Sequence, residues 1–178
     1  PAEPPLVDYS DLITPALSAT SWRTDVFTPP SGIANTGVDA GFYALAELSG
    51  RAYFDTDGDD LDAAAPDAEP GMRNIEVRLL RADDSSVVTT ALTSDTGAYT
   101  FTEVIPGDYL LEFVNTATAS FELITGTTAV TTTNPIASDI ETISPEGAGR
   151  TGTISVTSGE TLDEIDAGFR GLGEVSGR

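Results

Sequence analysis

The sequence predicts an all-β protein, built as an antiparallel β-sandwich. Apolar and polar residues alternate in short segments, and turn-forming residues separate these segments at regular intervals. No long segment shows the 3.6-residue periodicity of an amphipathic helix. Short strands joined by frequent turns are typical of a sandwich. A chain of 178 residues is long enough for one such domain with a sizeable core.

The alternation of period two is clearest in three segments, 75–79, 99–103 and 109–113. In each of them the apolar side chains share one face, and in the third segment Glu112 is expected to point outward. Further strands are predicted over residues 48–54, 87–93, 120–124, 138–143, 151–157 and 162–169. Turns are predicted where Gly, Pro, Asp and Ser gather, at residues 83–85, 95–97 and 106–108.

An internal repeat is the most informative feature of the sequence. Val38–Phe42 (VDAGF) recurs as Ile165–Phe169 (IDAGF), and Glu47–Arg51 (ELSGR) recurs as Glu174–Arg178 (EVSGR). Both pairs are separated by about 127 residues. Two independent matches in one register are hard to obtain by chance, so the repeat defines the frame of the chain.

In this frame residues 47–173 form one complete repeat, and residues 174–178 begin the next. Residues 1–46 correspond either to the C-terminal portion of a preceding repeat or to an N-terminal extension that donates a strand. The chain is then a segment of a tandem array of repeats, or a filament subunit whose N-terminal strand imitates the end strand of its neighbour. In both cases residues 24–42 are expected to occupy the strand position that residues 151–169 hold.

The composition excludes many kinds of chemistry. The chain has no Cys, no His and no Lys, because all eight basic residues are Arg. Disulfides, thiolate metal sites, Ser-His and Cys-His nucleophiles and Schiff-base lysines are therefore absent. Only carboxylates remain as acid-base groups, and a glycosidase-like pair would need them at strand ends lining a cleft. They gather instead in a loop of metal-binding type, so we expect no enzymatic activity.

The charge limits the partners. A net charge of −21 disfavours nucleic acid and anionic membrane surfaces, which both require clustered Lys and Arg. No apolar stretch approaches the roughly 20 residues that span a bilayer, so no membrane insertion is expected. Such a chain attracts cations, although much of the charge is explained by solubility alone.

One acidic segment, residues 55–62 (DTDGDDLD), directly follows a predicted strand. Its alternating aspartates let a tight loop turn several carboxylates inward, with Gly58 at the sharp turn. Two carboxylates about 4 Å apart repel by roughly 4 kcal/mol at an effective dielectric constant near 20. Calcium prefers six to eight oxygen ligands, whereas zinc prefers His and Cys. The segment therefore predicts a calcium site, and a plain solvated acidic loop is the alternative that the segment alone leaves open.

The wider sequence from Leu48 to Phe113 resembles the B-type repeats of Gram-positive serine-aspartate surface proteins, the SdrD B-like domains, which are relatives of the collagen-adhesin Cna B-type fold. The matching segments, in order, are residues 49–54, the acidic loop, 69–72, 75–77, 93–101, 104–109 and 165–169. The resemblance implies a Greek-key, transthyretin-like or Ig-like sandwich in extracellular stalks, with calcium stiffening tandem repeats at the cell surface.

The family pattern also implies a ligand set. It assigns the first, third and fifth loop positions to aspartates, a late position to a glutamate, and a contribution from a neighbouring loop to one more aspartate. With the remaining acidic residues of the segment, the candidate metal ligands are Asp55, Asp57, Asp59, Asp62, Asp67, Glu69 and Asp95.

The sequence departs from the family pattern in two places. Asp60 stands where Gly is usual, and about three extra residues separate Asp59 from Glu69, so the pattern does not fix the roles of Asp62 and Asp67. Outside the loop, Asp39 and Asp166 fit either a ligand role or a turn or strand-end role. Many Cna B-type domains carry a Lys–Asn cross-link, which a chain without Lys cannot form, so metal binding would have to supply the rigidity.

The leading functional hypothesis is an extracellular structural module, a calcium-stiffened repeat of a surface stalk or filament. Its partners are then copies of itself or adjacent repeats. The alternative is an adhesin domain that binds a host or matrix protein or a glycan. No row of aromatic residues marks such a binding site in the sequence.

Overall fold

The computed structural model describes residues 31–32, 41–62, 69–114, 121–126 and 137–172. Contacts divide the chain into two units, Pro1–Tyr43 and Ala44–Arg178, and the fold below belongs to the second. Most of the strand predicted over residues 24–42 lies outside the described residues. The acidic residues Asp39 and Asp67 also lie outside the described residues. The same holds for residues 174–178, the predicted start of the next repeat.

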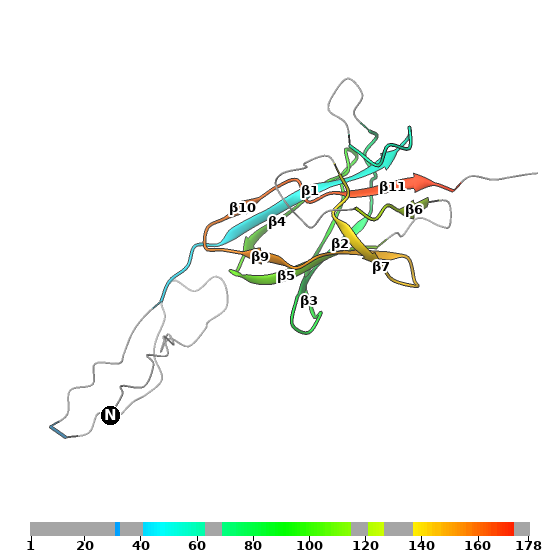
Figure 1. The fold of residues 1–178 in the computed structure, drawn as a ribbon. Coiled ribbons are helices and arrows are strands. Elements are labelled where there is room, and N and C mark those ends of the chain that lie inside the picture. The colour runs from blue at the N-terminus through cyan, green and yellow to red at the C-terminus, as the bar shows by residue number, and fades with distance from the viewer. Residues whose placement is uncertain (1–30, 33–40, 63–68, 115–120, 127–136, 173–178) are drawn as a thin grey trace, which may run out of the picture. The chain divides into compact units, whose positions relative to one another are not determined.

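The described part of the second unit contains strands and no helix (Figure 1), as the alternating pattern predicts. The strands are β1 (Ala46–Asp55), β2 (Glu76–Arg81), β3 (Val87–Leu92), β4 (Ala98–Val104), β5 (Gly107–Val114), β6 (Phe121–Leu123), β7 (Ile140–Ile143), β8 (Ala148–Thr151), β9 (Ile154–Val156), β10 (Thr161–Leu162) and β11 (Ala167–Gly171).

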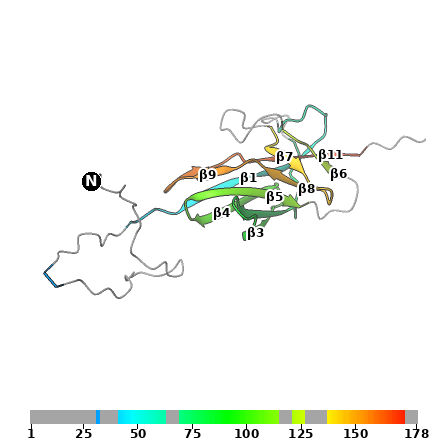
Figure 2. The same ribbon diagram turned by 60° about the horizontal axis from the view of Figure 1, so that its bottom comes forward.

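These strands form two sheets that face each other as a sandwich (Figures 1 and 2). In the first sheet β4 pairs with one edge of β1, β10 and β11 pair with its other edge, and β6 lies beyond β11. In the second sheet the order is β3-β2-β5, after which β8 and β9 share the free edge of β5 and β7 lies beyond β8. The predicted all-β sandwich is confirmed.

The core lies between the sheets and contains the predicted inward-facing residues. Tyr99 packs edge-on against Phe113 and Phe101, with ring centroids 5.6 and 5.8 Å apart. Alternate residues of β2, β4 and β5 are buried because successive side chains in a strand point to opposite faces. The buried residues of these strands, together with Ile75 directly before β2, include Val77, Leu79, Tyr99, Phe101, Tyr109, Leu111 and Phe113.

Glu112 differs from the expectation of an exposed side chain. It is only 6% exposed, although it belongs to the face of β5 that points away from the core. Its two carboxylate oxygens pair with Arg78 Nη1 at 3.0 Å and with Arg150 Nη2 at 2.8 Å. The alternation therefore predicted the direction of Glu112, while the covering arginines come from strands that are distant in sequence.

Two strand pairings are parallel. The first strand, β1, runs parallel to β10 and β11, with Glu47 opposite Thr161 and Asp55 opposite Arg170. The other pairings are antiparallel. Because β1 and β11 run in the same direction, β1 begins at one end of the sandwich and β11 finishes at the other (Figure 1).

Two strands predicted as continuous are interrupted. The segment 151–157 is divided between β8 and β9, because the Leu111 amide donates to Thr151 Oγ1 at 3.0 Å instead of to a backbone carbonyl of a neighbouring strand. The segment 162–169 is divided between β10 and β11, and Glu164 between them has a φ of 59°, a value outside regular strand geometry.

Candidate metal site

The acidic loop is held by the side chain that ends β1. Asp55 Oδ1 accepts a hydrogen bond from the Gly58 amide at 2.7 Å, and Oδ2 accepts one from the Asp60 amide at 3.3 Å. Gly58 and Asp60 have φ values of 83° and 64°, so the chain turns sharply twice within three residues. A carboxylate at the first loop position thus fixes the path of the whole turn.

Two further aspartates fold the loop locally. Asp57 Oδ1 accepts from the Asp59 amide at 3.1 Å, and Asp59 Oδ1 accepts from the Leu61 amide at 2.9 Å. Such bonds to the backbone two residues later are typical of Asp in turns. Leu61 then forms an isolated antiparallel bridge with Ala137, which joins the end of the loop to a distant segment.

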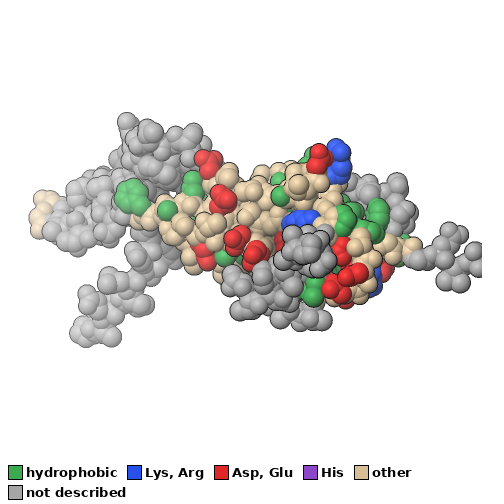
Figure 3. Space-filling model, turned by 90° about the horizontal axis from the view of Figure 1, so that it is seen from above, with side chains coloured by type: hydrophobic (Ala, Val, Ile, Leu, Met, Phe, Trp, Pro, Cys, Tyr) green, Lys and Arg blue, Asp and Glu red, His purple; other side chains and the backbone are tan. Residues whose placement is uncertain are grey.

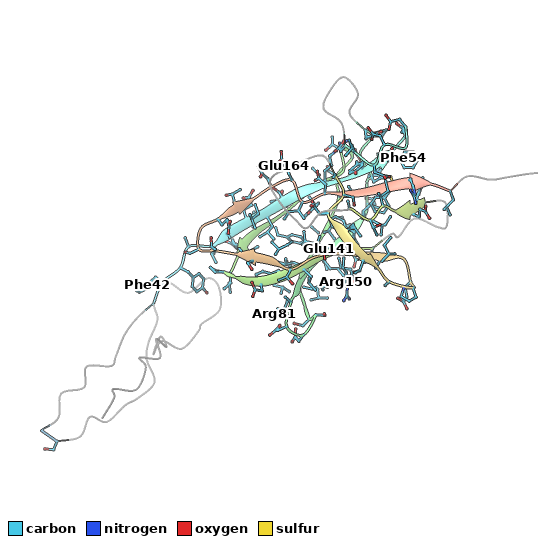
Figure 4. All side chains as sticks on the ribbon, viewed as in Figure 1. Phe42, Phe54, Arg81, Glu141, Arg150 and Glu164 are labelled. Carbon is cyan, nitrogen blue, oxygen red and sulfur yellow. The ribbon has the colours of Figure 1, made fainter. Side chains whose placement is uncertain are left out.

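Glu69 completes the site from the far side of the loop. Its Oε1 accepts from the Thr56 amide at 3.1 Å and its Oε2 from Thr56 Oγ1 at 2.7 Å. One carboxylate oxygen from each of Asp55, Asp57 and Glu69 lies within 4.8 Å of the other two. Asp55 and Glu69 are 4% and 5% exposed, whereas Asp57 is exposed. The three acids form a cluster at the C-terminal end of β1, where Asp55 directly follows Phe54, the residue labelled in Figure 4.

The negative charges of this group act on one another. The hydrogen bond from the Asp59 amide lowers the pKa of Asp57, but desolvation and the charges of Asp59, Glu69 and Asp55 outweigh it, so the pKa is raised above its ordinary value. Acidic side chains are also spread over the face seen in Figure 3, where arginines lie at only a few points. A bound cation would relieve the repulsion.

The donor set fits a hard divalent cation. The three carboxylates offer oxygen atoms only, which calcium and magnesium prefer and which suit zinc less well than His or Cys. Within the described residues this is the one group of three acids close enough to share an ion. Calcium, with its larger and more flexible coordination shell, accepts carboxylates from a loop more readily than magnesium does.

The other predicted ligands lie outside this group of three. Asp59 remains in the loop, and Asp62 forms an ion pair with Arg51. Asp95 pairs with Arg73 at 3.2 Å in the turn before β4, where its side chain is 82% exposed. Asp67 lies outside the described residues. Ligand roles for these four residues stay predictions.

Three residues that the sequence reasoning did not single out support the loop. Thr56 binds Glu69, as described above, and the Arg51 side chain contacts Asp62. The Tyr53 hydroxyl donates to the Asp60 carbonyl at 3.0 Å. Burial, followed by the charges of nearby aspartates, raises the pKa of Tyr53, so the hydroxyl remains a donor at any physiological pH. No local sequence pattern predicts these partners, because each pair is brought together only by the fold.

The fold and the site together define a β-sandwich module with an oxygen-only candidate ion site at the end of its first strand. The chain belongs to the family of SdrD B-like domains, whose model matches residues 46–169. Domains of this family are structural modules of surface proteins and not enzymes, which supports a structural surface module here. The resemblance seen in the sequence is thereby confirmed.

Other comparisons add little to the family match. No curated protein matches the chain. Among solved structures it is similar to GBS52, the minor pilin in Streptococcus agalactiae, at 12% identity and a TM-score of 0.43, over 76% of this chain and 49% of the pilin. The chain therefore spans about half the length of that pilin. In the described part of the chain, no helix is long and apolar enough to cross a membrane.

Proposed function

We propose that the chain is an extracellular structural module of a surface stalk or filament, stiffened by a calcium ion bound by Asp55, Asp57 and Glu69. The observation that carries this proposal is the convergence of one oxygen from each of these three carboxylates within 4.8 Å, with two of the three side chains almost fully buried. Unlike a solvated acidic turn, this arrangement holds its charges together against their repulsion.

Binding an ion there would tie together segments that already meet. Phe54 donates from its amide to the Pro70 carbonyl at 2.8 Å, and the Met72 amide donates to the Ala52 carbonyl at 2.8 Å. Asp55 and Glu69 extend this contact between β1 and the segment after the loop. An ion shared by their carboxylates would resist separation of the two segments. In this way the ion would make the module stiffer.

The strand topology suits a head-to-tail array. Since β1 begins at one end of the sandwich and β11 finishes at the other, successive modules would follow one another along one line. In the register of the internal repeat, the position equivalent to Ala46 is Gly173, two residues after the end of β11 at Gly171. Adjacent repeats would therefore be joined almost without a linker. Copies of the same module are the partners that this arrangement favours.

The test is thermal unfolding of the full chain with calcium or with EDTA. An ion at 100 times its dissociation constant adds about 2.7 kcal/mol, which corresponds to an increase in Tm of about 10 °C for a domain of this size. Asp55→Asn and Glu69→Gln should abolish the increase, whereas the exposed control Asp163→Asn should keep it. Magnesium should give a smaller increase. An unchanged Tm at millimolar calcium would count against the proposal.

The alternative of an adhesin domain remains a prediction from the sequence. No contact or cluster among the described residues favours a protein or glycan ligand over the structural role.

A further inference from the structure

Arg51 connects three segments around the candidate metal site. It lies in β1, and its side chain is 27% exposed. Its Nη1 pairs with the Asp62 carboxylate and its Nη2 donates to the Glu69 backbone carbonyl. Its Nε donates to the Thr96 carbonyl at 2.8 Å. One guanidinium thus holds the end of the acidic loop, the start of the segment after it, and the turn before β4.

We propose that Arg51 positions Glu69 for ion binding, and that Asp62 is the counter-ion of Arg51 and not a ligand of the ion. This inference rests on the proposed function. Arg51 binds both the Asp62 side chain and the Glu69 backbone, two residues that are seven positions apart in the sequence. Holding the Glu69 backbone limits the positions that its carboxylate can take beside Asp55 and Asp57.

The geometry requires arginine at this position. Its planar group presents five N–H donors in a fixed fork, so it can serve acceptors in three directions at once. A lysine would supply the same charge as a point, without the fork. Gln would keep hydrogen-bonding capacity but remove the charge that neutralises Asp62.

One observation favours the opposite assignment for Asp62. Its Oδ2 is taken by Arg51, but its Oδ1 is buried and has no hydrogen-bond partner among the described residues, and the side chain is only 9% exposed. A free buried carboxylate oxygen is available to an ion. Asp62 nevertheless lies outside the three acids whose oxygens converge, which favours the counter-ion role.

A purely electrostatic role and a positioning role of Arg51 predict opposite changes in calcium affinity when Arg51 is replaced. Removing a positive charge near an acidic site strengthens cation binding if charge alone matters. Removing a positioning group weakens it, and loss of an outer contact of this kind typically costs about 10- to 100-fold in metal affinity. The sign of the change therefore separates the two explanations.

The experiment is calorimetric titration of calcium into the full chain and its variants. Arg51→Gln and Arg51→Lys should each weaken calcium binding at least about tenfold. Arg81→Gln removes the same charge from an exposed position at the end of β2 and should leave the affinity unchanged or slightly higher. If Arg51→Gln binds calcium as tightly as the unchanged chain, or more tightly, positioning by Arg51 is overturned.

Asp62→Asn tests the counter-ion role separately, and is useful if the Arg51 variants do not fold. Arg51 would keep its two carbonyl acceptors, so the calcium affinity should change by less than about tenfold, the lower limit for loss of an outer contact. A loss of tenfold or more would make Asp62 a ligand and overturn its assignment. If the unchanged chain binds no calcium, the proposed function fails and this inference fails with it. If the unchanged chain binds calcium but Arg51→Gln binds it equally tightly, only this inference fails and the proposed function stands.

Discussion

At the scale of single residues, two buried carboxyl groups outside the candidate metal site have raised pKa values. Asp139 and Asp166 are 7% and 5% exposed. The Asp166 amide donates to Asp139 Oδ2 at 2.8 Å, and the Asp139 amide donates to the Asp166 carbonyl at 2.8 Å. Burial raises the pKa of Asp166 to about 7 despite a hydrogen bond from the Arg51 amide. Burial also raises the pKa of Asp139 to about 6.

These shifts predict that the calcium-free chain becomes more stable as the pH falls from 8 to 5. The ordinary pKa of Asp is about 3.9, so in this window the folded state binds protons that the unfolded state does not. The free energy of unfolding should increase by about 2–4 kcal/mol. Groups with lowered pKa values, such as Asp84 and Glu160, lose their contribution only below about pH 4. Urea denaturation at pH 8, 6.5 and 5 measures the change.

Asp166→Asn is the matched control, since it keeps the volume and removes the titration. The variant should lose most of the pH dependence in this window. A free energy of unfolding that falls between pH 8 and pH 5 would show that the two carboxyls are not protonated in the folded chain.

The sequence singled out the acids that cluster in the candidate site but not the residues that support them. Asp55, Asp57 and Glu69 could be singled out because carboxylates at loop spacing are a local pattern, and their role as ion ligands stays a prediction. Arg51 was not found, because its three acceptors come together only in the fold. For Asp166 the sequence left a ligand and a strand-end role open. Its bond of 2.7 Å from the Arg51 amide fits the strand-end role.

At the scale of elements, the backbones beneath the acidic loop are in direct contact. A Cβ on Gly50 of β1 would lie 2.0 Å from the Ile165 carbonyl oxygen. A Cβ on Gly71 would lie 2.1 Å from the carbonyl carbon of Thr96. Both neighbours are backbone atoms, which cannot rotate away as a flexible side chain could. The loop therefore rests on segments that are packed without side chains between them.

Gly50→Ala is accordingly expected to reduce the free energy of unfolding by about 3 kcal/mol or more, because β1 would have to move away from the segment before β11. Gly147→Ala is the control, at a φ of 85° with nothing within 4 Å of the added Cβ, and it should cost only about 1 kcal/mol. Urea denaturation compares the two. Equal costs would mean that the close approach at Gly50 is not a constraint.

The elements themselves were largely predictable, and their pairing was not. Alternation in segments such as 75–79 reports directly which side chains face the core, so strands and inward residues followed from the sequence. The parallel pairing of β1 with β11 joins residues more than 100 positions apart, and no local pattern encodes it. The break at Glu164 was also missed, because its positive φ belongs to a residue type that rarely adopts it.

At the scale of the whole molecule, the parallel pairing of β1 with β11 determines how the sandwich bears load. A force applied at the start of β1 and at the end of β11 pulls the two strands in opposite directions along their length. The backbone bonds between Ala52–Asp55 and Ala167–Arg170 are then loaded together, in shear. In the antiparallel pair of β1 and β4, Ala46 lies opposite Val104, so pulling these positions apart would break bonds one after another.

Single-molecule pulling should therefore show a higher unfolding force through the ends of the sandwich than across β1 and β4. The chain has no Cys, so handles attach only where cysteines are introduced. Ala44→Cys with Leu172→Cys gives the shear geometry, and Glu47→Cys with Glu103→Cys gives the unzipping geometry. Calcium should raise the shear force, because its candidate site follows directly on the C-terminal end of β1, whose ladder with β11 is loaded. Equal forces in the two geometries would contradict the mechanical role of the β1–β11 pair. If calcium does not change the unfolding force in the shear geometry, the ion does not contribute to the mechanical strength of the β1–β11 pair.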